Sequence, residues 1–305
     1  MSAVHSLLRP RAIPRELRAF SPTALAVRRF VRNRLAVVGL IIVLVFGAVG
    51  LLAPMLAPFP YDKTNLFKAW APPGRFPEHP LGTDDLGRDM LSRLMWGARV
   101  SLIVSIGAMS VALTLSVTLG FLSGYFGGLW DFVLNRLFEI TSALPGLLFQ
   151  ILFMLLFGNG IVQVTLAISL LSWPNLARLV RAQVLAYKER EFIQAAYSLG
   201  ASTPFIWVRH LLPNILNPLI IAVTFAIPAY IGAEAGLSFL GYGINDPLPS
   251  WGKMVGAVSR YIASPNYLYV AALPTAALAL LVLGFSFFGD GLREALDPAV
   301  ERARL

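Results

Sequence analysis

Six runs of apolar residues constrain the fold of this chain more than any other feature. The clearest run, residues 35–53, contains no charged residue and ends at Pro54. A helix needs about 20 mostly apolar residues to cross the roughly 30 Å hydrocarbon layer of a membrane. We therefore predict an all-α, polytopic membrane protein with six transmembrane helices. Besides 35–53, the predicted spans are 100–126, 143–157, 161–176, 215–236 and 267–288.

The composition supports a membrane location. Hydrophobic residues make up 57% of the 305 residues and charged residues only 13%, whereas soluble domains average about 25% charged residues. So little charge cannot cover a soluble protein of this size, which excludes a soluble enzyme, a disordered tail and a secreted disulfide scaffold. The chain has no cysteine, and this excludes disulfides, thiolate metal sites and cysteine nucleophiles.

The net charge of +9 is best explained by membrane topology. If the N-terminus is cytoplasmic, the cytoplasmic segments hold 17 Lys and Arg residues and the outer segments hold 8. Cytoplasmic loops carry an excess of these residues, so we expect both termini in the cytoplasm and no nucleic-acid partner. We expect the first span to be an uncleaved helix, because 34 residues precede it and its apolar core exceeds that of a signal peptide.

These spans divide the chain into five parts. They are a cytoplasmic N-terminal segment (1–34), the first transmembrane helix (35–53), an extracytoplasmic loop (54–99), a five-helix core (100–289) that includes a cytoplasmic loop (187–213), and a cytoplasmic tail (290–305). In the outer loop, the helical spacing of Leu86, Met90 and Leu94 predicts a short amphipathic helix. The acidic pair Asp84 and Asp85 suits capping of that helix, with a cation site as the alternative.

The cytoplasmic loop 187–213 predicts a helix–turn–helix. Residues 188–199 read as a helix, and Gly200 stands where a left-handed C-terminal cap is expected. Pro204 suits the first turn of a second helix, which we expect to stop near Pro213.

Composition alone leaves two interpretations of this loop open. The small side chains of Ala195 and Ala196 leave room for another surface, and the flanking Phe192 and Leu199 can anchor the helix in a groove. An amphipathic helix lying on the bilayer would show a similar pattern.

Glu234 is the one carboxylate inside a predicted span. Such groups usually face a cavity or a partner, so Glu234 is a candidate for lining a translocation pathway. Because it lies near the outer end of its span, interfacial hydration or backbone hydrogen bonding is the alternative.

The sequence shows no catalytic motif. The only Gly-Lys pair, Gly252-Lys253, lacks the Ser or Thr of a phosphate-binding loop. The histidines His5, His79 and His210 are far apart and show no metal-ligand spacing. We therefore expect no catalytic residue, no metal site and no ATP hydrolysis by this chain.

The cytoplasmic loop resembles the EAA loop of ABC importer permeases. That pattern is Glu-Ala-Ala, three residues, Gly, nine residues, Ile, one residue and Leu-Pro. Its spacing is kept here by Gln194, Ala195, Ala196, Gly200, Leu212 and Pro213. Gln194 replaces the acid and His210 replaces Ile. A neutral amide still donates and accepts hydrogen bonds, so the loop keeps its capacity to dock.

Further segments resemble the C-type subunit of the dipeptide/oligopeptide/nickel permeases. They occur in family order between about residues 28 and 298, and they are 32–40, 79–89, 124–128, 237–241, 249–252 and 289–298. The resemblance implies the type I ABC importer permease fold in a bacterial cytoplasmic (inner) membrane. It also implies half of a translocation pathway for di- and oligopeptides, with nickel, opines or other small solutes as alternative cargoes.

The resemblance also implies partners. They are a second permease subunit, two ATP-binding cassette ATPase subunits and an extracytoplasmic substrate-binding protein. ATP and Mg²⁺ would be bound by the ATPases, with no cofactor on this chain. The residues implied in coupling to the ATPases are Glu191, Phe192, Gln194, Ala195, Ala196, Leu199, Gly200 and Pro213. An ion-coupled secondary transporter is the alternative, and it would need ion-relay carboxylates in several spans.

Overall fold

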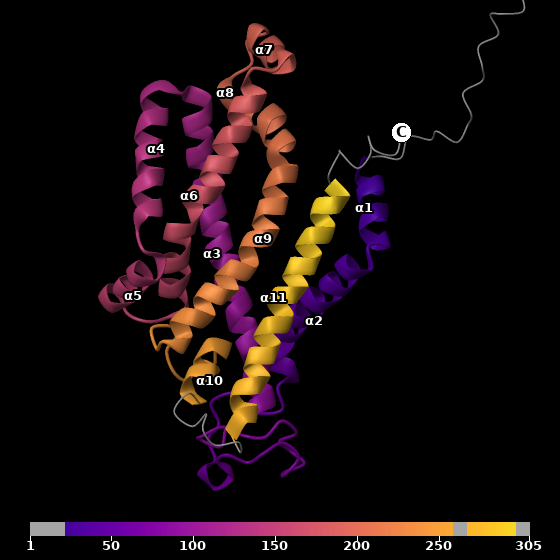
Figure 1. Ribbon diagram of the computed structural model, residues 1–305, viewed down its shortest axis with the longest axis vertical. Coiled ribbons are helices and arrows are strands. Elements are labelled where there is room, and N and C mark those ends of the chain that lie inside the picture. The colour runs from indigo at the N-terminus through magenta and orange to yellow at the C-terminus, as the bar shows by residue number, and fades with distance from the viewer. Residues whose placement is uncertain (1–21, 259–266, 297–305) are drawn as a thin grey trace, which may run out of the picture.

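The computed structural model describes residues 22–258 and 267–296, whose regular secondary structure is helical, with no strand among them. The long helices run side by side in one elongated bundle, with α7 at one end and the 57–89 loop at the other (Figure 1). The helices are α1 (Pro22–Arg32), α2 (Arg34–Leu56), α3 (Met90–Phe126), α4 (Gly128–Ala143), α5 (Gly146–Phe157), α6 (Ile161–Lys188), α7 (Glu191–Ser198), α8 (Thr203–Ile206), α9 (Leu212–Phe239), α10 (Trp251–Val258) and α11 (Leu268–Leu296). A 3-10 turn, η1 (Leu66–Lys68), and a π-helical turn, η2 (Trp207–Leu211), complete the set.

Four stretches of helix among the described residues are long and apolar enough to cross a membrane. They are α2, α3, the continuous stretch from α8 to the end of α9, and α11. The pair α4 and α5, bent by 89°, makes a fifth only if it is counted as one span. The prediction of six spans is therefore not confirmed.

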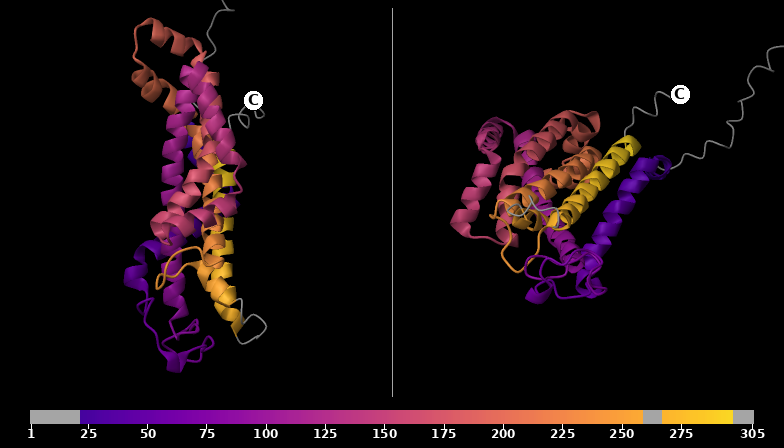
Figure 2. Two further views of the ribbon diagram at one scale, coloured as in Figure 1. Left: turned by 90° about the vertical axis from the view of Figure 1, so that its left-hand side faces the viewer. Right: turned by 60° about the horizontal axis from the view of Figure 1, so that its bottom comes forward.

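Helix α6 accounts for part of this difference. Its second half carries Asn175, Arg178 and Arg181, which lower its apolar character. Its neighbours are α3, α4, α5 and α9, and α4 and α5 flank it on the side away from α2 and α11 (Figure 2). A helix surrounded by other helices presents little surface to lipid, so it needs fewer apolar residues than an exposed span. The predicted end of this helix at residue 176 is wrong, because α6 continues past Pro174 to Lys188.

The predicted separate amphipathic helix at the outer loop does not exist. Met90 starts α3, which runs without interruption for 37 residues to Phe126, and Leu86 lies in the loop before it. The cap of α3 is Asp89, whose side chain accepts a hydrogen bond from the Ser92 N–H at 2.7 Å. No residue between Met90 and Val100 breaks the helix, so the amphipathic turn and the span merge.

The predicted span 143–157 does not form one helix, because it covers the end of α4, a break and α5. Its apolar part is α5, whose 12 residues are about 18 Å long at 1.5 Å per residue, too short to cross a membrane. The break before α5 falls at Leu144–Pro145, because proline cannot continue the hydrogen bonds of α4. The stretch 130–142, predicted to lie outside the membrane helices, belongs to α4.

Pro213 does not end a helix, contrary to the prediction. It lies in the first turn of α9, directly after the π-helical turn η2, in which the backbone hydrogen bonds change register. The π-helical turn η2 joins α8 to α9, so helical structure continues from Thr203 to Phe239. One connected element therefore links the α7 end of the molecule to the opposite end.

Two glycines allow close packing of helices. A Cβ atom on Gly39 of α2 would lie 2.5 Å from the backbone nitrogen of Phe288 in α11. A Cβ atom on Gly252 of α10 would collide with the carbonyl oxygen of Ala235 in α9. Small residues permit such backbone contacts between membrane helices.

Candidate functional site

The predicted coupling loop projects from one end of the bundle as a short helix and a tight turn (Figure 1). Gly200 has φ +80°, the left-handed conformation that favours glycine. Its N–H donates to the carbonyl of Tyr197 at 2.9 Å, and the N–H of Ala201 donates to that of Ala196 at 3.1 Å. These two bonds form the Schellman arrangement, which confirms the predicted glycine cap.

One face of α7 anchors it to the bundle. Ile193 is 3% exposed and belongs to an apolar cluster that also contains Val184 of α6 and Ile206 of α8. The ring of His210 lies 5.6 Å from that of Phe205 and 6.3 Å from that of Phe192 (between centroids), so His210 joins the aromatic contacts beneath α7.

The opposite face of α7 is exposed. Phe192 is 43% exposed and Leu199, the C-cap of α7, is 88% exposed, so two large apolar side chains face solvent here. The structure brings together the predicted residues of this loop, which are Glu191, Phe192, Gln194, Ala195, Ala196, Leu199 and Gly200. Pro213 lies apart from them, at the start of α9.

Gln194 has a structural role that the replaced acid could not have. Its Nε2 donates a hydrogen bond of 3.3 Å to the carbonyl oxygen of Lys188, at the end of α6. A carboxylate has no proton to donate. The departure from the EAA pattern at Gln194 therefore comes with a contact of its own.

An ion pair near this end was not predicted from the sequence. Arg181 of α6 donates two hydrogen bonds to Asp131 of α4, at 2.6 and 2.7 Å. Ser123 of α3 also donates to Asp131, at 2.5 Å. Three helices thus meet at one carboxylate. The only signal in the sequence was the presence of charges within helices, since no local spacing links Asp131 to a residue 50 positions away.

Glu234 is fully buried near the opposite end of α9. Its carboxylate accepts hydrogen bonds from Ser101 of α3 at 2.9 Å, from Ser238 of α9 at 2.8 Å and from Ser250 just before α10 at 2.6 Å. The structure therefore places Glu234 at a junction of three segments, with no surface open to a pathway in this conformation. It lies far along α9 from the predicted coupling residues.

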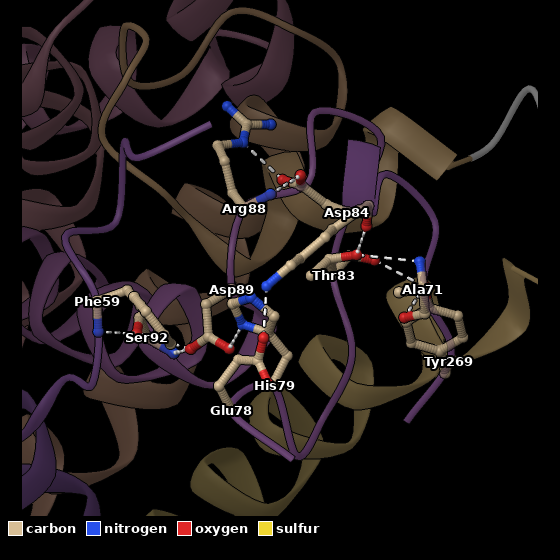
Figure 3. A network of polar contacts seen from close by, with 11 residues as sticks. Phe59, Ala71, Glu78, His79, Thr83, Asp84, Arg88, Asp89, Ser92 and Tyr269 are labelled. Carbon is tan, nitrogen blue, oxygen red and sulfur yellow. Dashed lines mark hydrogen bonds and ion pairs between the residues drawn. The ribbon is translucent and has the colours of Figure 1, made fainter. Parts of the chain in front are cut away.

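The loop between α2 and α3 is fixed by polar contacts (Figure 3). His79 Nδ1 lies 3.0 Å from an oxygen of Asp89, the α3 cap. The hydroxyl of Tyr269 in α11 donates to the carbonyls of Ala71 and Thr83, at 2.9 and 2.6 Å. The loop is thereby attached to both α3 and α11.

Asp84 shapes this loop, and it does not cap α3. It accepts hydrogen bonds from the N–H groups of Leu86 and Arg88, at 3.0 and 2.9 Å, and pairs with the Arg88 side chain at 2.6 Å. No group of three or more His, Asp or Glu within the described ranges could hold a metal. The prediction that Asp84 and Asp85 cap the helix is wrong, because Asp89 occupies that position.

A cavity of about 410 Å³ lies between this loop, α10 and α11. Its charged lining includes Asp62, Asp84, Arg88, Arg93, Asp246 and Lys253. The Lys253 ammonium, 2.9 Å from the Asp246 carboxylate, holds the pKa of that carboxyl below its usual value. Acidic and basic groups thus pair with one another around the cavity.

The family model described as the inner membrane component of binding-protein-dependent transport systems matches residues 116–302, and the model of the N-terminal transmembrane domain of oligopeptide transport permease C matches 21–73. The chain belongs to this family of inner membrane transport components, as the EAA pattern and the ordered segments predicted.

Curated relatives match nearly the whole chain. The oligopeptide transport system permease protein OppC of Escherichia coli K12 is 42% identical over 273 residues, covering 89% of each chain. OppC of Bacillus subtilis strain 168 is 38% identical over 277 residues, covering 91% of this chain and 90% of the relative. The dipeptide transport system permease protein DppC of Alkalihalophilus pseudofirmus is 38% identical over 283 residues, covering 93% and 92%.

A solved structure shares the fold. A chain from the inward-facing MetNI methionine ABC transporter superposes with a TM-score of 0.53 at 18% identity, covering 68% of this chain and 98% of that one. The predicted type I ABC importer permease fold is thereby confirmed.

Proposed function

We propose that this chain is a permease subunit of an ATP-driven importer of di- and oligopeptides. The peptide cargo is assigned from the sequence identity to relatives named as oligopeptide or dipeptide permeases, which is 37–42% over about nine tenths of the chain. The chain forms half of the translocation pathway, and a second permease forms the other half. It lies in a bacterial inner membrane with both termini in the cytoplasm.

The exposed face of α7 supports a role in coupling. Phe192 and Leu199 present apolar side chains beyond the end of the bundle, and Ala195 leaves space between them for a partner's surface. We assign this face to one of two cytoplasmic ATPases, which bind ATP and Mg²⁺ and carry out the hydrolysis. The bilayer-surface alternative fits less well, because α7 carries no basic residue on the exposed face.

The connection from α7 to α9 supports transmission of movement. Gly200 fixes the angle between α7 and α8, and α8 continues through η2 into α9. When the ATPases move α7, α9 is displaced with it, as in alternating access by rigid-body rocking. The opposite end of the bundle faces an extracytoplasmic substrate-binding protein.

Glu234 is a less direct candidate for the pathway. Its three hydrogen bonds would have to open before the carboxylate could meet a peptide amino group. Peptide uptake by a Glu234→Gln variant tests this role. Unchanged uptake would show that transport does not require the charge of Glu234.

Purification of the complex tests the function. The tagged chain is expressed with its native neighbours, extracted in mild detergent and analysed for stoichiometric partners. We expect a second permease and one or two ATPases, and ATP-dependent uptake of labelled peptide by proteoliposomes that contain the complex and its binding protein. Recovery of the chain alone, with uptake driven by an ion gradient, would establish a secondary transporter instead.

A further inference from the structure

The cavity between the 57–89 loop, α10 and α11 has room for a small molecule. Its volume of about 410 Å³ is that of a small ligand pocket. Met90, Met254 and Val270 form an apolar part of its lining, and all three are buried. Charged side chains line much of the rest. What the cavity can bind depends on which of these charged groups already have partners within the protein.

Two ion pairs in the lining are complete. The carboxylate of Asp84 accepts a hydrogen bond from the Arg88 side chain at 2.6 Å and two more from backbone N–H groups (Figure 3). The Lys253 ammonium lies 2.9 Å from Asp246 and donates to the carbonyl of Ile244 at 3.2 Å. These groups shape the wall of the cavity and have little charge left to offer a ligand.

Arg93 of α3 also lines the cavity, and its hydrogen bonding is incomplete. The residue is only 3% exposed, and its Nη1 donates to the carbonyl of Tyr61 at 3.2 Å. Its Nε has no hydrogen-bond partner. An oxygen of Asp84 lies 3.3 Å from this Nε, but the same oxygen accepts the shorter bond from Arg88. A buried guanidinium with N–H groups left over favours an additional acceptor, and a carboxylate is the acceptor that fits it best.

A carboxylate without a partner lies at the exposed side of the same cavity. Asp62 lines the cavity and forms no hydrogen bond or ion pair within the part of the chain that the structure describes. It directly follows Tyr61, whose carbonyl Arg93 holds. Asp62 and Arg93 therefore lie on adjoining parts of the lining, and each can take a group of opposite charge.

We propose that this cavity binds a small zwitterion with a free ammonium and a free carboxylate, as in amino acids and short peptides. The carboxylate of the ligand accepts hydrogen bonds from Arg93, its ammonium meets Asp62, and an apolar side chain packs against Met254 and Val270. A simple anion fits less well, because Asp62 would repel it. Binding of a zwitterion requires neither ATP hydrolysis nor transport, so the site does not depend on the proposed function.

Protection of an introduced cysteine tests this site. The chain has no cysteine of its own, and Ala257 is an exposed residue of the lining. Ala257→Cys is labelled with a maleimide in the purified complex of permeases and ATPases, without the binding protein. We expect the dipeptide alanyl-leucine to slow this labelling in a saturable manner, which gives the half-protecting concentration. Labelling of Leu199→Cys, at the other end of the molecule, should not change.

Analogues of the dipeptide separate its two charges. Alanyl-leucine amide lacks the carboxylate, and its half-protecting concentration should be about tenfold higher or more, because the hydrogen bonds to a buried charge are lost. N-acetyl-alanyl-leucine lacks the ammonium, and its concentration should be about two- to fivefold higher, because Asp62 is exposed. Free leucine identifies the source of the ligand: equal protection by leucine assigns the site to amino acids, and weaker protection assigns it to peptides.

A variant of Arg93 distinguishes binding from a structural role. Arg93→Gln should raise the half-protecting concentration of alanyl-leucine about tenfold or more, but leave that of the amide unchanged. Arg99→Gln is the matched control, because Arg99 lies on the same helix and donates to the carbonyl of Leu51, outside the cavity. Arg260→Gln is a second control, in the segment 259–266 that follows α10 and lies outside the described residues. Neither control should alter protection.

Four results would overturn the proposal. They are no protection by alanyl-leucine or leucine, equal protection by alanyl-leucine and its amide, equal weakening of both ligands by Arg93→Gln, and a loss in either control as large as that in Arg93→Gln. If Arg93→Gln does not assemble, the comparison of the analogues on Ala257→Cys still decides. Absence of protection in a complex that takes up peptide with ATP would overturn this site alone and leave the proposed function standing.

Discussion

A buried carboxylate in an apolar helix is stable when its oxygens accept hydrogen bonds. Glu234 meets this condition through serine hydroxyls from three segments. Glu234 could be singled out in the sequence because a charge stands out in an apolar run. Its partners could not, because Ser101 lies 133 residues away and nothing near it distinguishes it from other serines.

Replacing Glu234 with leucine should destabilise the protein by about 1–3 kcal/mol, the cost of a buried polar group without a partner. Ser238 and Ser101 lie within helices and can turn to a carbonyl one turn back, but Ser250 has no such acceptor within a helix. Glu234→Gln should lose less stability, since the amide oxygen of Gln can still accept hydrogen bonds from the serines. Unfolding midpoints in detergent measure both variants. Equal losses would show that the negative charge, not the hydrogen bonding, stabilises this junction.

Gly252 and Gly232 form a matched pair for packing. Gly252→Ala should destabilise the protein by about 1–3 kcal/mol, because its Cβ would meet the Ala235 carbonyl oxygen and force α10 away from α9. Gly232→Ala, with nothing within 4 Å of its Cβ, should be neutral or stabilise α9 by up to about 1 kcal/mol. Thermal unfolding of the two variants measures the difference, and similar midpoints would mean that α10 can shift freely.

The helix–turn–helix was predictable, but its continuation was not. The Gly200 turn has a local signal, since few residues tolerate its left-handed backbone. Pro213 gave the wrong prediction, because a proline ends a helix in its interior but is accepted in the first turn. Whether the helix ends at Pro213 depends on the π-helical turn before it, where the backbone hydrogen bonds change register. No residue type in Trp207–Leu211 predicts that change from the sequence.

Gly200→Ala should strain the turn by about 1–2 kcal/mol, and Gly200→Glu should also place a charge against the partner surface. We expect both variants to insert and assemble, while peptide uptake per ATP hydrolysed falls, more for Glu. ATPase and uptake assays on the purified complex measure this ratio. Gly74→Ala is the control, since Gly74 has the same positive φ (81°) and free space around its Cβ but lies in the loop between α2 and α3, at the opposite end of the bundle. A fall of the same size in the control would assign the effect to strain alone.

The helical class of the whole chain followed from hydropathy, but the number of spans did not. Hydropathy measures how favourable it is for a segment to be surrounded by lipid. It misjudges α6, because that helix is largely surrounded by protein. Arg181 is acceptable in α6 because Asp131 of α4 pairs with it. Such pairing between distant helices is a property of the assembled bundle, and a single window of sequence cannot show it.

The orientation of the molecule can be measured with introduced cysteines, because the chain has none of its own. Phe67 is fully exposed in the loop between α2 and α3, and Leu199 is 88% exposed at the other end. With both termini in the cytoplasm, a membrane-impermeant maleimide should label Phe67→Cys on spheroplasts and Leu199→Cys only in inside-out vesicles. The reverse pattern would invert the topology.

The contact between α2 and α11 has a consequence for biogenesis. Asn33 and Glu294, which join these helices, are 261 residues apart along the chain. At synthesis rates of about 5–20 residues per second, α2 therefore waits on the order of tens of seconds before α11 emerges from the ribosome. During that time the surface of α2 around Gly39, which packs against the backbone of Phe288 in the folded protein, has no α11 to contact and must meet lipid or the insertion machinery instead. The first membrane-spanning helix to be made is thus among the last to be fixed by its tertiary contacts.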